Sequence, residues 1–167
     1  PDAADGMARS LAAGVSALPE GAVAVMVLLA DMPDVTTEDM RRVLAAFDGE
    51  VILRGATADG KLGHPVVFPF RDFAALRSLE GDEGAKTIME TNADRVRPVV
   101  LPYSHARTDL DTPEDWAAWR RGGAAARASA ITADSLRCAL RMWRSQRQIG
   151  IWRSVFSIDL LRPSQRT

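Results

Sequence analysis

The fold is decided by the stretch Val25-Met26-Val27-Leu28-Leu29-Ala30, which runs directly into Asp31-Met32-Pro33. A short apolar run that is rich in branched side chains and bounded by a breaker is typical of a strand buried on both faces of a parallel sheet. Asp31 then lies at the carboxyl end of the strand, where open α/β sheets bind their ligands. Asp31 is well placed to hold a divalent cation, but Asp before Pro is also common in turns, and the spacing leaves both interpretations open.

Segments typical of strands and helices alternate along the first 120 residues. The expected strands after the first are residues 51–53, 66–68 and 96–101, and the expected helices are residues 36–47, 70–79, 82–91 and a helix from 112. Hydroxyl or acidic caps at Thr36, Asp82 and Thr112 favour these helix starts, and Gly49 is expected to close the first helix. The alternation predicts an α/β fold with a parallel or mostly parallel sheet, in which Pro98 puts the last strand at an edge.

The composition is that of a globular protein with one core, since 47% of its 167 residues are hydrophobic and 26% are charged. The single Cys138 excludes an internal disulfide, and with His64 and His105 as the two histidines, zinc and redox chemistry have no support. No apolar stretch is as long as the roughly 18 residues of a membrane span, and no signal peptide pattern opens the chain. We therefore expect a cytoplasmic protein without a membrane partner.

The charge is divided unevenly along the chain. Residues 1–120 contain 12 basic and 20 acidic residues, whereas residues 121–167 contain 9 arginines and 2 aspartates. These two parts define the expected organisation: a domain over 1–120 and a basic C-terminal extension over 121–167, either helical or disordered. The arginines follow no groove-binding motif, so no specific nucleic-acid partner is expected.

Four segments carry the chemistry: Leu28 to Pro33, Gly63 to Phe68, Gly81 to Ala85 and Asp109 to Asp115. Together with an upstream segment, Asp5 to Gly14, their order and spacing resemble the MobA-like nucleotidyltransferases, closest to the molybdenum cofactor cytidylyltransferases. The resemblance covers Asp5 to about Arg120. Each motif is weak alone, but five motifs in one order favour this family strongly.

The resemblance implies a Rossmann-like, three-layer nucleotidyltransferase fold of the GT-A-like kind. It also implies transfer of CMP from CTP to the molybdenum-pterin cofactor, with release of pyrophosphate. A molybdoenzyme or its chaperone is then an expected protein partner. The expected cofactor is Mg²⁺ or Mn²⁺, because a cation that bridges phosphate oxygens offsets their charge in the transition state.

Two aspartates are the expected catalytic and metal-binding residues. Asp31 matches the magnesium-binding aspartate of the family and is expected to contact the nucleotide as well. Asp111 is its candidate partner, because Asp109-Leu110-Asp111 follows a strand. The alternative for Asp111 is that it only favours the start of the helix that follows it.

Other expected contacts follow from the remaining motifs. Ser10 resembles a family position near the nucleotide base. Gly63, His64 and Pro65 suit an acceptor pocket, although a surface histidine in a turn is the simpler explanation. Gly81, Asp82 and Gly84 are also expected to contact the acceptor, through backbone amides at a helix start, although Asp82 is more often just a cap.

The chain departs from the family at its beginning. The family opens with a strand and a glycine-rich loop, Leu-Ala-Ala-Gly followed by Ser, Arg-Met-Gly and a lysine, which holds the triphosphate. Here Leu11-Ala12-Ala13-Gly14 is followed by Val15-Ser16-Ala17-Leu18 and falls inside a later motif. We therefore expect an N-terminally truncated domain that does not transfer the nucleotide by itself.

Two alternatives stay open at this point. One is a related guanylyl- or other nucleotidyltransferase that acts on another phosphorylated acceptor. The other is a catalytically inactive remnant, or a partner module that needs a second chain to hold the triphosphate.

Overall fold

The computed structural model describes residues 6–81 and 84–127 of the chain. The elements, in order, are α1 (Gly6–Ser16), β1 (Ala24–Val27), α2 (Thr37–Ala45), β2 (Ile52–Ala56), β3 (Leu62–Pro69), the 3₁₀ turn η2 (Phe70–Asp72), α3 (Phe73–Arg77), α4 (Lys86–Thr91), the 3₁₀ turn η3 (Ala93–Arg95), β4 (Val96–Val100) and α5 (Pro113–Arg127). Asp82, Cys138 and the extension from residue 128 onward lie outside the described residues.

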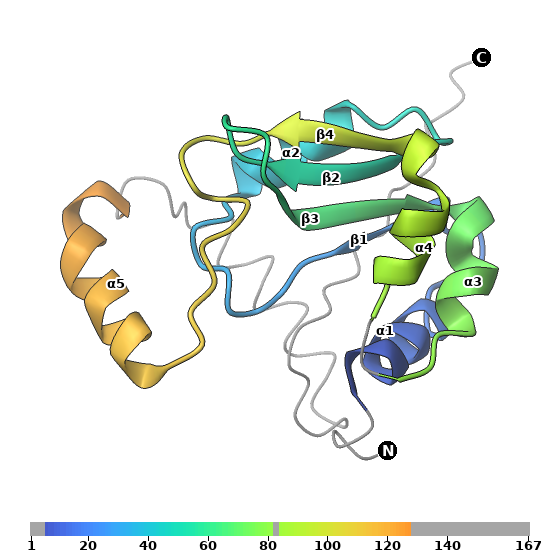
Figure 1. Ribbon diagram of the computed structural model, residues 1–167, viewed down its shortest axis with the longest axis horizontal. Helices are drawn as coiled ribbons and strands as arrows, with labels where there is room; N and C mark the ends of the chain where they lie inside the picture. The colour runs from blue at the N-terminus through green and yellow to red at the C-terminus, as the bar shows by residue number, and fades with distance from the viewer. Residues whose placement is uncertain (1–5, 82–83, 128–167) are drawn as a thin grey trace.

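The strands form one four-stranded sheet in the order β1-β3-β2-β4, as Figure 1 shows. β3 pairs antiparallel with both β1 and β2, while β2 pairs parallel with β4. Three strands therefore run in one direction and β3 runs against them. The connection from β2 to β3 is too short for the crossover of about a dozen residues that parallel neighbours need, so these two strands form a hairpin.

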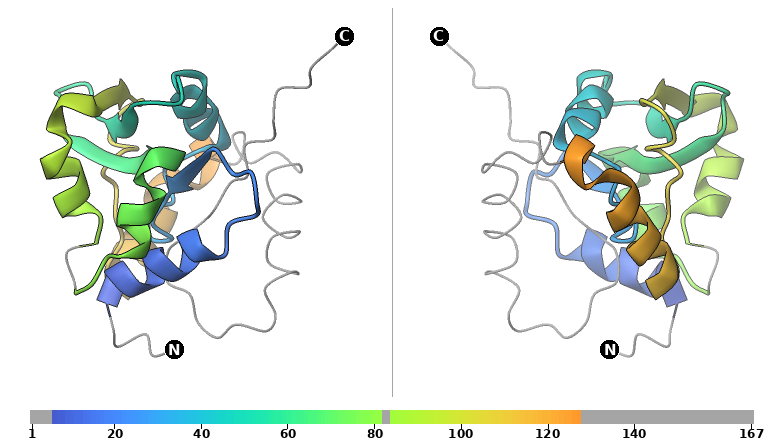
Figure 2. Two further views of the ribbon diagram at one scale, coloured as in Figure 1. Left: turned by 90° about the vertical axis from the view of Figure 1, so that its right-hand side faces the viewer. Right: turned by 90° about the vertical axis from the view of Figure 1, so that its left-hand side faces the viewer.

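Alternate residues of the strands face two separate cores. On one face, Val25 and Phe68 pack with Leu11 of α1, Phe73 of α3 and Ile88 of α4. On the other face, strand residues pack with α2; they include Met26, Leu53 and Val67, and the helix contributes Val43. The fold is thus a mixed α/β domain of three layers, with α2 on one side and α1, α3 and α4 on the other (Figures 1 and 2).

β1 is shorter than the sequence predicts. It ends at Val27, which pairs with Val66 of β3, whereas we expected the strand to continue to Ala30. The next residue of β3 is Pro65, which has no N–H with which to extend the ladder. Asp31 consequently lies in a turn some residues beyond the end of the strand, rather than directly after its last residue.

The predicted helices are present, but several of their boundaries differ from the prediction. Thr36 caps α2 in a capping box with Asp39, as expected, but the helix ends at Ala45, and Gly49 lies in a turn before β2 with φ +94°. The predicted helix over 70–79 is a 3₁₀ turn followed by the short α3. The prediction that Asp82 caps the next helix is wrong, because α4 begins only at Lys86, with Ala85 at its N-cap.

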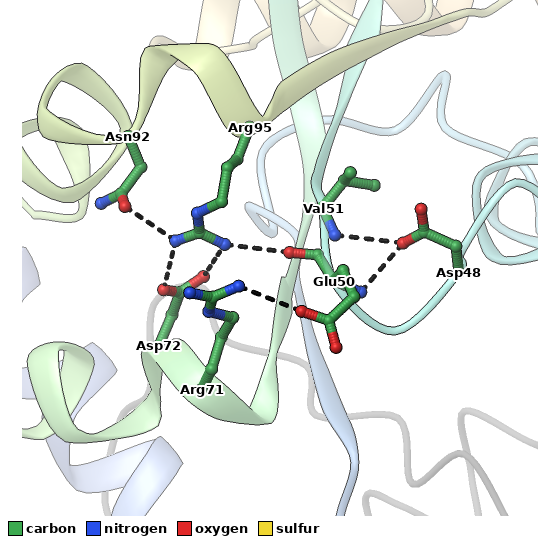
Figure 3. Close-up of polar contacts among 7 residues, drawn as sticks. All are labelled: Asp48, Glu50, Val51, Arg71, Asp72, Asn92 and Arg95. Carbon is green, nitrogen blue, oxygen red and sulfur yellow. Dashed lines mark hydrogen bonds and ion pairs between the residues drawn. The ribbon is translucent and has the colours of Figure 1, made fainter.

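A buried ion pair fixes the edge of the sheet at which β4 begins. Arg95 donates from Nη2 to Asp72 Oδ1 at 2.7 Å and to Asn92 Oδ1 at 2.8 Å, and its Nη1 donates to the carbonyl of Glu50 at 2.9 Å. These contacts, drawn in Figure 3, join η3, which leads into β4, with η2, which follows β3, and with the turn before β2. The nearby Arg71–Glu50 pair is exposed, with 55% and 72% of the two side chains accessible.

We predict that Asp72→Asn destabilises the fold by about 3 kcal/mol, because it leaves Arg95 buried without its counter-charge. Glu50→Gln is the matched control in the same network and should cost less than about 1 kcal/mol, since exposed pairs contribute little. Urea unfolding of the two variants measures both values. Equal losses in the two variants would contradict the assignment.

Candidate functional site

The loops that follow β1, β2 and β4 meet at one edge of the sheet, because these three strands point the same way. Backbone hydrogen bonds fasten the loops together there. Leu110 N donates to Asp31 O at 2.9 Å, and Leu101 N donates to Ala56 O at 2.8 Å. The edge is therefore a fixed backbone frame, and α5 stands beside it (Figure 1).

A cleft of about 490 Å³ opens at this edge. It is lined by Ala30, Asp31, Leu110, Asp111, Thr112, Pro113, Trp116 and Arg120. The structure thus brings together the two aspartates that the sequence singled out. The other walls come from the loop after β1 and the first turns of α5.

Asp31 is half-buried, and its Oδ1 is fully enclosed without a hydrogen-bond partner. A buried carboxylate oxygen without a partner is costly, so such atoms usually mark a site for a ligand, a water or an ion. The orphaned oxygen and the second carboxylate in the same cleft fit an oxygen-binding divalent cation, which needs only one or two carboxylates and completes its shell with water. No cluster of three or more His, Cys, Asp or Glu exists among residues 6–81 and 84–127.

Asp111 is exposed and immediately precedes the cap of α5. The capping hydrogen bonds use a different acid: Asp115 Oδ2 accepts from Thr112 N at 3.0 Å, and Asp115 N donates to Thr112 Oγ1 at 3.1 Å. Thr112 and Asp115 therefore cap the N-terminus of α5, as the sequence predicted for this helix. Capping does not engage the carboxylate of Asp111.

His64 lies on β3, near enough to Asp31 to be affected by its charge but outside the lining of the cleft. The pKa of His64 lies below its usual value, and burial is the main cause. The charge of Arg54 also lowers the pKa, while a hydrogen bond to the backbone of Val27 and the charge of Asp31 raise it. Its Nδ1 is buried without a partner. A neutral imidazole that donates from its other nitrogen to the carbonyl of Val27 keeps a lone pair on Nδ1, which can accept a hydrogen bond.

Gly63 is required by a close approach of two backbone segments. A Cβ at this position would lie 1.8 Å from the carbonyl oxygen of Ala106. The next residue uses that same oxygen, because His64 N donates to Ala106 O at 2.8 Å. Gly63 thereby lets the turn after β4 sit directly on the start of β3, and its contact with an acceptor stays a prediction.

The other predicted contact residues lie apart from the cleft lining. Gly84 lies against Met7 at the start of α1, with φ +56°, and Gly81 is exposed in the same loop, with φ +77°. Ser10 is half-buried on α1, and Pro65 is buried on β3. The acceptor role of the loop from Gly81 to Gly84, and the base contact of Ser10, stay predictions.

Two cleft residues were missed in the sequence. Trp116 lines the cleft, and Arg120 contributes a cation to the same wall. Pro113, Trp116 and Arg120 recur at helical spacing, so this pattern could have indicated a face turned toward Asp111. Trp119 holds the helix in place, since its Nε1 donates to Asp34 Oδ1 at 2.7 Å.

A three-layer α/β domain with an acidic cleft at the carboxyl ends of its strands has the architecture of a nucleotidyltransferase. The model of the MobA-like NTP transferase domain matches residues 1–96. The chain therefore belongs to the MobA-like NTP transferase family.

Individual relatives agree with this assignment. Purine catabolism protein PucB of Bacillus subtilis (strain 168) is 28% identical over 122 residues, which make up 72% of this chain and 58% of PucB. Rv0371c from Mycobacterium tuberculosis H37Rv aligns with a TM-score of 0.60 and 26% identity, over 68% of this chain and 59% of that one. A complex of Rv0371c with manganese aligns with a TM-score of 0.54 and 26% identity, over 65% and 57%. The chain thus spans less than two thirds of the length of these relatives.

None of the helices in the described part of the chain combines the length and the apolar character needed to cross a membrane.

We predict that Gly63→Ala destabilises the protein by about 1–3 kcal/mol, because the new methyl group must displace the backbone at Ala106. Gly122→Ala is the control, since its Cβ would meet nothing within 4 Å. That variant should be neutral or slightly stabilising, because alanine favours helices. Thermal unfolding compares the two, and a Gly63→Ala variant as stable as the parent would refute the close contact.

We also predict that stability falls with pH below 6.5, the ordinary pKa of histidine. The lowered pKa of His64 means that the unfolded chain takes up a proton which the folded state resists, so stability declines as the pH drops and levels off below the folded-state pKa. His64→Gln cannot titrate and should show a smaller decline. Urea unfolding at several pH values tests this, and an unchanged pH dependence in His64→Gln would exclude His64 as the cause.

Proposed function

We propose that this chain forms the metal- and acceptor-binding part of a nucleotidyltransferase that transfers CMP from CTP to the molybdenum-pterin cofactor and releases pyrophosphate. The observation that carries the proposal is the cleft shared by Asp31 and Asp111 at the carboxyl edge of the sheet, with Asp31 Oδ1 buried and unpartnered. Membership of the MobA-like family supports the reaction class. The choice of CTP and of this acceptor rests on the motif resemblance.

In this proposal Asp31 and Asp111 hold Mg²⁺ or Mn²⁺ together with water. The manganese complex of Rv0371c supports a divalent cation in a related protein. When bound, the cation neutralises charge on the phosphate oxygens, which otherwise repel an anionic acceptor. The enclosed position of Asp31 Oδ1 suits this role, because a carboxylate shielded from water binds a cation more strongly than an exposed one.

The remaining side chains orient and neutralise the ligands. Arg120 places a cation on the cleft wall, where it can pair with a phosphate group. Trp116 lines the apolar part of the wall and limits access of water.

The fixed loops around the cleft supply pre-organisation. The Leu110–Asp31 hydrogen bond joins the backbones of the two segments that carry the carboxylates. Holding two charged groups at a set separation avoids much of the reorganisation that phosphoryl transfer would otherwise require. The triphosphate itself needs further backbone donors, which a glycine-rich loop of this family would supply.

We predict that Asp31→Asn weakens Mn²⁺ binding at least about tenfold and lowers turnover by about a hundredfold or more, because it removes the charge and keeps the shape. Asp109→Asn is the matched control, because this exposed residue of the same segment does not line the cleft. Mn²⁺ binding is measured on the chain itself by electron paramagnetic resonance. Equal Mn²⁺ affinity in Asp31→Asn and Asp109→Asn would contradict the metal assignment.

Turnover is measured as pyrophosphate release with molybdenum-loaded pterin, on a version of the chain that carries the glycine-rich loop of the family at its N-terminus. CTP and GTP are compared side by side. Release with CTP supports the proposal, and release with GTP alone assigns the chain to the related guanylyltransferases. Release with neither nucleotide, in a version that still binds Mn²⁺, would refute the proposed reaction.

A further inference from the structure

A second hollow, of about 410 Å³, opens at the same edge of the sheet as the cleft. It lies between the β2–β3 hairpin and the turn after β4, and its lining includes Thr57, Lys61, Tyr103, Ser104 and Arg107. No residue lines both the hollow and the cleft. It is therefore a separate feature that the proposed reaction at Asp31 does not use.

Tyr103 is the unusual residue of this hollow. Its side chain is 86% exposed, and it is the one non-glycine residue with positive φ (+48°) in the described parts of the chain. A bulky residue in the left-handed region costs of order 1 kcal/mol, and the exposed ring gains no burial in return. An outlier of this kind is typical of a residue that is held ready for a ligand.

The ring is presented by a well-braced turn. Arg107 N donates to Ser104 O at 2.8 Å, Thr108 N donates to the same oxygen at 2.9 Å, and His105 N donates to Pro102 O at 3.1 Å. His105 is in turn anchored on α2, with its Nδ1 2.8 Å from Asp39 Oδ2. The backbone that carries Tyr103 is thus braced, and its ring lies against the ring of His105, with the two centroids 5.9 Å apart.

The hollow carries a net positive charge, because Lys61 is paired with Asp59 at 2.8 Å whereas Arg107, from the same turn as Tyr103, donates only to a neutral carbonyl, that of Leu62, at 3.1 Å. Lys61 and Arg107 line the hollow, and Asp59 is the acid among its lining residues. Hydrogen bonds from Lys61 and Thr57 lower the pKa of Asp59 to about 2, so it balances one of the two cations. Behind them, the half-buried Arg54 adds a further positive charge, and its pKa is lowered by burial and by Arg107.

We propose that this hollow binds a planar heteroaromatic anion, with the ring of the ligand on Tyr103 and its anionic group on Arg107. Stacking on an aromatic ring and pairing of an anion with arginine are complementary, because the first recognises any flat ring and the second requires negative charge. The hollow shares its edge with the cleft, so such a ligand would lie beside the proposed metal site. The inference stands on the hollow alone and does not require the proposed reaction.

The test uses pterin-6-carboxylate, a fluorescent planar anion, titrated with the protein at low salt. Saturable quenching is expected, and Tyr103→Gly should weaken binding about tenfold or more through loss of stacking. This variant relieves the positive φ, so its melting temperature should not fall and lost binding would not reflect unfolding. Tyr103→Phe keeps the ring and should bind like the parent, while Arg107→Gln should bind more weakly and with less dependence on salt.

Phe70→Ala is the matched control, because Phe70 is a second exposed aromatic residue, at 64%, and lies outside the hollow. Neutral, unsubstituted pterin should bind at least about tenfold more weakly than the carboxylate, since it lacks the anion that pairs with arginine. Absence of saturable binding, or equal affinity in Tyr103→Gly and the parent, would overturn the proposal. If the probe no longer bound to Asp31→Asn but still bound to Tyr103→Gly, it would lie in the cleft, and this result would also overturn the proposal. Mn²⁺ binding reports on the cleft independently of the probe.

Discussion

The close packing of Gly63 against the carbonyl of Ala106 is the constraint on which the functional edge depends. It lets the turn after β4 pack on the start of β3, where His64 N donates a hydrogen bond to Ala106 O. From that turn the chain reaches Leu110, whose N–H binds the carbonyl of Asp31. The absence of a Cβ at Gly63 thus permits the backbone path that carries both Tyr103 and Asp111, and with this path the cleft and the second hollow.

The opposite edge of the sheet is built for stability. There the ion pair of Asp72 and Arg95 is largely buried, both oxygens of Asp72 accept from the guanidinium, and the guanidinium also donates to the carbonyl of Glu50 and to Asn92. At the functional edge, by contrast, Asp31 Oδ1 and His64 Nδ1 are buried without partners, and Tyr103 holds a positive φ in solvent. Unsatisfied polar atoms and backbone strain collect where ligands bind, and the satisfied network at the other edge offsets their cost.

Several features were predictable because they rest on local chemistry. The apolar run from Val25 predicted a buried strand, the spacing of Thr36 and Asp39 predicted a capped helix, and Pro98 predicted an edge strand. The structure confirms all three. The pairing of Asp31 with Asp111 was predicted as a juxtaposition at the carboxyl edge, and both residues line one cleft. The early end of β1 was missed because it depends on Pro65 in a strand some forty positions away. Tyr103 was not predicted as a functional residue for a similar reason: the sequence around it indicates neither its positive φ nor its exposure.

Anomalous X-ray diffraction from crystals soaked in Mn²⁺ tests the central claim most directly, because it locates the cation without any assumption about the reaction. The account predicts one strong peak in the cleft, coordinated by a carboxylate oxygen of Asp31 and one of Asp111, with water in the remaining positions. A peak held by other residues, or a cleft without a peak at saturating Mn²⁺, would contradict the assignment of this edge as a metal-dependent nucleotidyl-transfer site.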